Sequence, residues 1–167
     1  MVSATYQTFN FNLISFAGVK GILSVNCSTI TLITLRSCLF INSNPSDRAI
    51  FVTALFDTSP ETICFVADND EEALDIMNSE RITPNYIFVE LSMPGIDGLQ
   101  FLTRIKQVKR LRKTPVIVHC STSDKQYIES LMARGAFAIY SLPYNYKGMC
   151  NLLMLCFNQK WSKLCLN

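Results

Sequence analysis

Two side chains with catalytic potential are neighbours in this sequence. His119, the only histidine of the chain, directly precedes Cys120. A thiol and an imidazole within hydrogen-bond distance can act as nucleophile and base. Successive residues of one strand, however, point to opposite faces of a sheet. We therefore predict no Cys–His catalytic pair and expect His119 to be packed or partly exposed.

The seven cysteines show no metal-binding spacing. None belongs to a CxxC or CxxxC pair, and with one histidine in the chain we predict no structural zinc site. An odd, scattered set is typical of reduced thiols and of a cytoplasmic protein. Most lie at apolar positions, where we expect them to act as small hydrophobes, and Cys165 is the expected exposed thiol.

The composition is that of a folded domain. Of the 167 residues, 49% are hydrophobic and 17% are charged, which excludes an intrinsically disordered chain. The net charge of +2 is too small to indicate a nucleic acid partner. Six cations lie between Arg104 and Lys113, and we interpret them as the solvated C-terminal end of a helix. We expect no nucleic acid and no membrane among the partners.

Charge is distributed unevenly along the chain. All 13 acidic residues lie at or after Asp47, whereas residues 1–37 carry only Lys20 and Arg36. The uncharged stretch 21–35 is too short and too polar to predict a membrane span. We predict a flexible N-terminal extension over 1–35, a domain over 36–160 and a tail over 161–167.

From residue 36 on, short apolar runs alternate with helical patterns. The five predicted strands are Cys38–Ile41, Thr62–Val66, Tyr86–Leu91, Pro115–Val118 and Phe137–Tyr140. A helix is predicted after each strand, with Asn44, Asp97 and Asn145 as N-caps and a capping box of Ser123 and Gln126 before the fourth helix. This alternation predicts an α/β fold, a doubly wound five-stranded parallel sheet with five helices.

In doubly wound folds, ligands bind at the carboxyl ends of the strands. The residues to interpret for function are therefore 42–44, 90–92, 119–121 and 141–143. These four segments follow the first, third, fourth and fifth predicted strands.

The segment Tyr86–Leu99, YIFVELSMPGIDGL, resembles the response-regulator receiver domain. In that family an apolar strand ends in a phosphoacceptor aspartate, and the loop Met-Pro-Gly-x-Asp-Gly follows. Supporting matches are Asn44–Arg48, Ala67–Leu74, Thr114–Val118 and Gly135-Ala136. The resemblance covers residues 38–160 and implies a flavodoxin-like sheet of the receiver type.

The resemblance also implies a phosphorylation site, and this sequence departs from it at each position. Receivers hold magnesium with an acidic pair, which matches the neutral Asn42 and Ser43, poor ligands for a hard cation. The acceptor aspartate matches Glu90, whose longer side chain displaces the nucleophilic oxygen from in-line geometry. We therefore expect the magnesium ion to be lost and no cofactor to be used.

Three further positions of the receiver mechanism have changed. The hydroxyl that binds the phosphoryl group matches Cys120, a weak donor, and the lysine matches Leu142. The switch aromatic matches Ile139, with Tyr140 beside it. We predict a pseudo-receiver in which no residue is catalytically active, and so no enzyme.

Two interpretations of Glu90 remain open. It either mimics aspartyl phosphate permanently, or it is a carboxylate held by Asn42, Ser43 and backbone N–H groups. In a partly buried position its pKa should be raised by desolvation, because no lysine is adjacent.

The functional hypothesis is a stand-alone, cytoplasmic receiver-like protein of a two-component pathway or phosphorelay that acts by protein–protein interaction. Expected partners are a histidine kinase, another response regulator or a second copy of the chain. The alternatives are a genuine phosphoacceptor that uses Glu90, a flavodoxin-like binder of a small ligand, and a decaying gene product. The expected interaction face carries aromatic residues and methionines, namely Tyr127, Met132, Tyr140, Tyr144, Tyr146, Met149 and Trp161.

Overall fold

The chain divides into two compact units, Met1–Leu35 and Arg36–Asn167. The computed structural model describes residues 12–16, 19–26, 29–34, 36–78, 83–92, 97–140 and 145–158. None of the helices in these ranges is long and apolar enough to cross a membrane.

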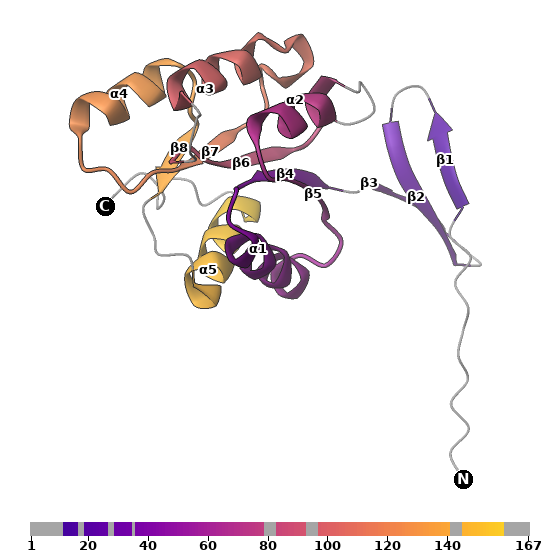
Figure 1. The fold of residues 1–167 in the computed structure, drawn as a ribbon. Helices are drawn as coiled ribbons and strands as arrows, with labels where there is room; N and C mark the ends of the chain where they lie inside the picture. Colours follow the sequence, from indigo (N-terminus) through magenta and orange to yellow (C-terminus); the bar gives the residue numbers. More distant parts are fainter. Residues whose placement is uncertain are drawn as a thin grey trace. The chain divides into compact units, whose positions relative to one another are not determined.

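The first unit contains a three-stranded antiparallel sheet with the order β1-β2-β3. Its strands are β1 (Asn12–Phe16), β2 (Val19–Asn26) and β3 (Thr29–Thr34), coloured indigo to violet in Figure 1. These strands lie in the segment 1–35 for which we predicted a flexible extension. Valine, isoleucine and threonine are frequent in this segment and favour strands, and two residues separate each strand from the next, as in a hairpin.

The second unit is a doubly wound sheet with the strand order β5-β4-β6-β7-β8, and every neighbouring pair is parallel. This confirms the predicted fold class. The strands are β4 (Ser37–Ile41), β5 (Ile63–Ala67), β6 (Tyr86–Glu90), β7 (Val116–His119) and β8 (Ala138–Tyr140). The helices are α1 (Pro45–Thr58), α2 (Asp70–Asn78), α3 (Gly98–Gln107), α4 (Lys125–Ala133) and α5 (Tyr146–Phe157), with a short 3-10 helix η1 (Lys109–Leu111) after α3.

Side-chain caps begin the helices at the predicted places, with one exception. Asn44 Oδ1 accepts the Ser46 N–H at 2.9 Å, Asp97 Oδ1 accepts the Leu99 N–H at 3.0 Å, and Asn145 Oδ1 accepts the Gly148 N–H at 2.8 Å. The predicted capping box of α4 is wrong, because Asp124, and not Ser123, is the N-cap. A carboxylate at this position also has a favourable interaction with the helix dipole.

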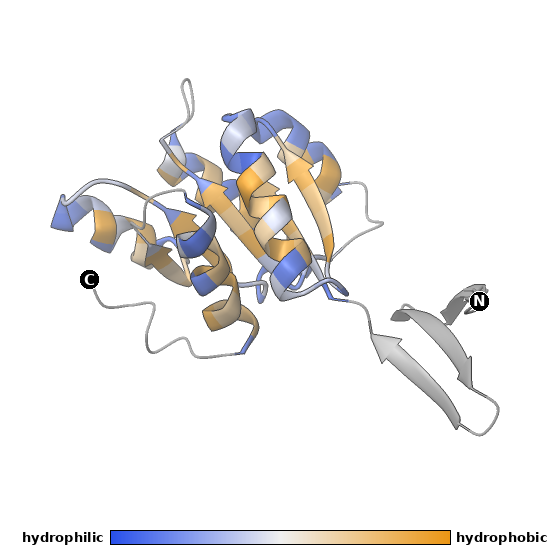
Figure 2. Cartoon of the chain, turned by 90° about the horizontal axis from the view of Figure 1, so that it is seen from below, coloured by the Kyte–Doolittle hydropathy of each residue, from blue (hydrophilic) through white to orange (hydrophobic). Residues whose placement is uncertain are grey.

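Helices cover both faces of the sheet (Figure 1). One face, which we call the α1/α5 face, packs on α1 and α5, while the α2/α3/α4 face packs on the other three helices. Figure 2 shows the strands in hydrophobic colours and hydrophilic residues on the outer sides of the helices. Strands covered on both faces explain the nearly continuous apolar runs of the sequence.

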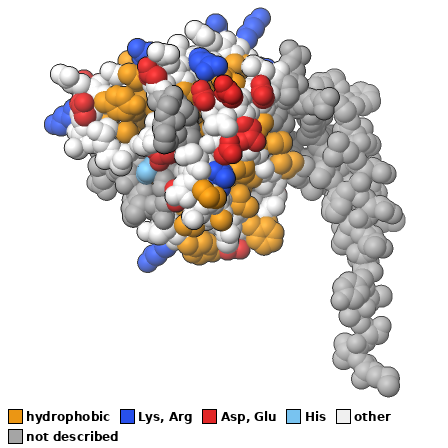
Figure 3. All heavy atoms as spheres, viewed as in Figure 1, with side chains coloured by type: hydrophobic (Ala, Val, Ile, Leu, Met, Phe, Trp, Pro, Cys, Tyr) orange, Lys and Arg blue, Asp and Glu red, His pale blue; other side chains and the backbone are white. Residues whose placement is uncertain are grey.

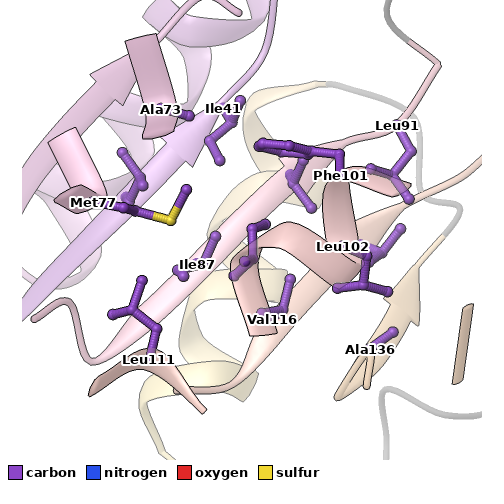
Figure 4. Packing of buried hydrophobic residues seen from close by; sticks show 14 of the residues in the cluster. Ile41, Ala73, Met77, Ile87, Leu91, Phe101, Leu102, Leu111, Val116 and Ala136 are labelled. Carbon is purple, nitrogen blue, oxygen red and sulfur yellow. The ribbon is translucent and has the colours of Figure 1, made fainter. Parts of the chain in front are cut away.

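Each face has its own hydrophobic cluster. On the α2/α3/α4 face, Phe101, Leu102 and Met77 pack against Ile87 and Val116 of the strands (Figure 4). On the α1/α5 face, the ring of Phe51 stacks on Phe40 with centroids 3.9 Å apart and meets Phe88 edge to face at 5.1 Å. These two clusters hold the strand ends in a fixed relation to one another.

Candidate site at the carboxyl edge of the sheet

A row of side chains crosses the carboxyl edge of four strands. Glu90 of β6 is the direct partner of His119 in β7, and His119 is the partner of Tyr140 in β8. Ile41 pairs with Val89, so Asn42 lies one residue further, level with Glu90. Because side chains alternate along a strand, the row lies on the α1/α5 face, two residues beyond Phe40, Phe88 and Ile117.

The Glu90 carboxylate has partners on both oxygens. Its Oε2 pairs with His119 Nδ1, and its Oε1 accepts the backbone N–H of Ser92 at 2.8 Å. Glu90 and His119 are both buried, with 9% and 8% of their surface exposed. The imidazole lies beside the ring of Tyr140, with centroids 4.9 Å apart. Glu90 is therefore held in place by His119 on the neighbouring strand and by the backbone two residues further along its own segment.

These partners reverse the pKa shift that we predicted for Glu90. Burial acts to raise the pKa of the carboxyl, but the hydrogen bonds from His119 and Ser92 outweigh it and lower the pKa below its ordinary value. The prediction of a raised pKa is wrong because it considered the missing lysine and overlooked His119. Glu90 and His119 are 29 positions apart in the sequence, so no local pattern brings them together.

Asn42 is fixed at the end of β4 by three hydrogen bonds. Its Oδ1 accepts the Asn44 N–H at 2.7 Å, its backbone N–H donates to the Ala67 carbonyl, and its carbonyl accepts from Arg48 Nη1 at 2.7 Å. The side chain is 1% exposed, and its Nδ2 has no hydrogen-bond partner among the described residues. Ser43, in contrast, is exposed.

Cys120 points to the opposite face from His119. It lies in the cluster of the α2/α3/α4 face, 5% exposed, with half-buried Ile139 packed against the same cluster. The structure thus separates the thiol from the imidazole, as predicted. Tyr140 is on the His119 side, so it does not take the place of the switch aromatic beside Cys120. Leu142 lies outside the described residues.

The predicted interaction face is only partly accessible. Tyr140 is 5% exposed and belongs to the core, so its assignment to a partner surface is wrong. Side chains along β8 alternate between the two faces of the sheet, and this alternation places Tyr140 on the covered α1/α5 face. Tyr127 is half-buried and Met149 is buried. Tyr146 is 47% exposed and donates its hydroxyl to Asp57 Oδ2 of α1 at 2.6 Å. Tyr144 and Trp161, like the expected exposed thiol Cys165, lie outside the described residues.

Sequence reasoning missed Phe137 as an exposed residue. It was predicted to begin the fifth strand, yet it precedes β8 and is 41% exposed, close in sequence to Met132, which is 44% exposed.

Figure 3 shows one face of the molecule, on which acidic side chains gather over α2, whose first turn carries Asp70, Glu71 and Glu72. The described residues contain no group of three or more His, Cys, Asp or Glu side chains that could hold a metal ion.

Comparison with known proteins connects this geometry to a family. The model of the response regulator receiver domain matches residues 39–153. A putative transcriptional regulator of Pseudomonas aeruginosa is 29% identical over 107 residues, which are 64% of this chain and 49% of that protein. The DNA-binding transcriptional regulator NtrC of Klebsiella pneumoniae is 30% identical over 105 residues, 63% of this chain. The chain spans about half and about a fifth of the lengths of these two relatives.

Solved structures show the same fold. The chemotaxis response regulator CheY4 of Vibrio cholerae superposes with a TM-score of 0.64 at 19% identity, covering 77% of this chain and 99% of that one. The Mn(2+)-bound form of response regulator Rcp1 gives a TM-score of 0.65 at 16% identity, covering 79% and 99%. The family match spans most of the second unit and runs from β4 into α5. This chain belongs to the response regulator receiver domain family of two-component signalling.

Proposed function

We propose that this receiver domain signals without aspartyl phosphorylation and acts as a pseudo-receiver through protein–protein contacts. The observation that carries the proposal is the engagement of both Glu90 oxygens, by His119 and by the Ser92 N–H. An attacking carboxylate needs one oxygen free and aligned with the incoming phosphoryl group. In-line attack from Glu90 would require breaking one of these hydrogen bonds.

The donor atoms at this edge do not fit a magnesium ion. Magnesium requires near-octahedral oxygen ligands at close range. Asn42 uses its amide oxygen to accept the Asn44 N–H, and the Glu90 oxygens are both engaged. At this edge, the buried amide nitrogen of Asn42, which is a donor, has no partner among the described residues. Magnesium-dependent phosphoryl transfer therefore has no place in the proposed function, and the domain is not an enzyme.

The chemistry also favours a structural role of Glu90 over permanent mimicry of aspartyl phosphate. A phosphoryl group draws a hydroxyl and a cation of the receiver toward it, but Cys120 faces the other side of the sheet. Both Glu90 oxygens are instead engaged locally, by His119 and by the Ser92 N–H. We infer that the domain occupies one state, set by this pair, rather than switching between two.

The proposed partners are signalling proteins, such as a histidine kinase or another response regulator. Exposed Met132 and Phe137, which we call the α4–β8 surface, supply the apolar contact area. Methionine and aromatic side chains suit such surfaces because they give large contact areas with adaptable packing. A second copy of the chain is a further partner that this surface fits.

Phosphodonor labelling tests the proposal. The full chain is incubated with acetyl phosphate and magnesium, and intact-mass spectrometry is expected to show no phosphoryl adduct. A matched control restores the family residues by Asn42→Asp, Glu90→Asp, Cys120→Thr and Leu142→Lys, and this variant is expected to be labelled. A base-labile phosphoryl adduct mapped to Glu90 in the parent protein would contradict the proposal and support a genuine phosphoacceptor.

A further inference from the structure

Two cysteines lie side by side in the α1/α5 face of the sheet. Cys38 of β4 and Cys64 of β5 are direct partners in the parallel ladder. Both belong to the α1/α5 side, Cys38 inside the hydrophobic cluster and Cys64 packed against it. Neighbouring strands are about 4.8 Å apart, within the range of about 4.4–6.8 Å over which a disulfide joins two Cα atoms. The backbone thus places these thiols at bonding separation.

The two cysteines differ in their access to solvent. β5 is the outermost strand of the five-stranded sheet, next to β4 (Figure 1). Cys64 on this edge strand is half-buried, whereas Cys38 is fully buried. A small reagent that approaches from solvent therefore meets Cys64 first. Cys38 lies behind it, where only Cys64 and the core surround it.

The interaction between the two thiols assigns their roles in the same order. Together with burial, it raises the pKa of Cys38 and keeps that thiol protonated. The same interaction lowers the pKa of Cys64, although burial opposes the shift. A thiolate, rather than a thiol, attacks electrophiles. The more accessible cysteine is thus also the better nucleophile.

A third cysteine provides an internal comparison. Cys156 of α5 lies in the same cluster and is fully buried. Burial raises the pKa of its thiol to about 12, so Cys156, like Cys38, is not the thiolate that attacks a peroxide first. Cys156 lies beside Cys38 and is therefore the alternative disulfide partner, which an experiment must distinguish from Cys64.

We propose that Cys38 and Cys64 form a peroxide-sensitive dithiol that closes to a disulfide between β4 and β5. The Cys64 thiolate attacks the O–O bond of a hydroperoxide, which forms a sulfenic acid on Cys64 and releases an alcohol, or water from hydrogen peroxide, once the leaving oxygen is protonated. Cys38 transfers its proton to the sulfenic hydroxyl as its sulfur attacks Cys64, so the S–S bond forms, the S–O bond breaks and water leaves. The two thiols lose two electrons, and the peroxide gains them. A thiol reductant reverses the change by exchange.

Peptide mapping of the full chain tests this reaction, because trypsin separates the two cysteines. Cleavage after Arg36, Arg48 and Arg81 yields peptide 37–48 with Cys38 and peptide 49–81 with Cys64, each holding one cysteine. The protein is treated with hydrogen peroxide, its remaining thiols are alkylated, and it is digested. We expect the two peptides linked, lighter than their sum by two hydrogens, and separated again by dithiothreitol.

Single variants assign the bond and provide the control. Cys64→Ser is expected to abolish the linked pair, while Cys150→Ser, a half-buried cysteine of α5, is expected to leave it unchanged. Circular dichroism of each variant before treatment verifies the fold. The proposal is overturned if peroxide leaves both peptides alkylated, if Cys64 is oxidised to sulfinic acid without a link, or if peptide 37–48 is linked instead to peptide 148–160, which carries Cys150 and Cys156.

Discussion

The Glu90 carboxylate and the His119 imidazole form a buried pair across β6 and β7, because the two residues are direct partners in the parallel ladder. Receivers use this edge of the sheet for phosphoryl chemistry. Here the same place in the fold holds an interaction that ties two strands together. We therefore expect the pair to stabilise this edge, and the same contact underlies the proposed loss of phosphorylation.

Acidification should remove the stabilisation that the Glu90 pair contributes. The pKa of Glu90 is lowered by folding, so the pair stabilises the domain above the ordinary value of 4.5, and the contribution is lost as the pH falls through the folded-state pKa. In urea unfolding, Glu90→Gln should cost about 1.5–3 kcal/mol near neutral pH. The difference from wild type should shrink as the pH falls below the ordinary value. A difference that stays constant with pH would contradict this assignment.

Removing the imidazole should reverse the direction of the Glu90 shift. In His119→Leu the burial of Glu90 persists while its main hydrogen-bond partner is lost, so we expect its pKa to rise above the ordinary glutamate value. Nuclear magnetic resonance titration of the Glu90 carboxyl carbon measures this pKa. Ser121→Ala, an exposed change at the same strand end, should leave it unaltered. A Glu90 pKa that remains low without His119 would refute the role given to the pair.

The stacked phenylalanines should account for much of the stability of the α1/α5 face. Phe51→Ala removes a fully buried ring that contacts Phe40 and Phe88, and about 3–5 kcal/mol of the free energy of unfolding should be lost. Phe56, on the same helix, is 71% exposed, so Phe56→Ala should change the free energy of unfolding by about 0.5 kcal/mol or less. Equal losses from the two variants in urea titrations would show that this packing is misassigned.

Deleting residues 1–34 should leave the second unit folded. That unit has a complete five-stranded sheet and both hydrophobic clusters. Thermal melts of the truncated and full-length chains should differ by only a few degrees, about the effect of 1 kcal/mol on a domain of this size. Aggregation of the truncated chain, or loss of a cooperative transition, would instead show that the second unit depends on the first.

The α4–β8 surface should contribute to partner binding more than an equally exposed site elsewhere. Met132→Ser and Phe137→Ser are expected to weaken self-association or binding to a partner kinase several-fold, since an interface anchor is worth more than about 1 kcal/mol. Met154→Ser is the matched control, because Met154 is 45% exposed on α5 and Met132 is 44% exposed on α4. Sedimentation and calorimetry measure the affinities. Equal affinities for the Met132 and Met154 variants would place the interface elsewhere.

Local patterns in the sequence were sufficient for the fold of the second unit. Alternating apolar runs, the caps Asn44, Asp97 and Asn145 and the Met-Pro-Gly-Ile-Asp-Gly loop predicted the five strands, the five helices and the family. Each signal depends on residues a few positions apart, and short-range chemistry determines it. The antiparallel sheet of residues 12–34 was not predicted, since a hairpin meander carries a weaker local signal than a capped helix.

Relationships across the sheet depended on tertiary structure. Glu90 meets His119, and Cys38 meets Cys64, only because parallel strands from separate parts of the chain align in one register. The same register decides that Tyr140 is buried and that Cys120 faces away from His119. A shift of one residue would exchange the two faces of a strand. Sequence therefore determined which residues stand at the strand ends, and strand register determined which of them interact.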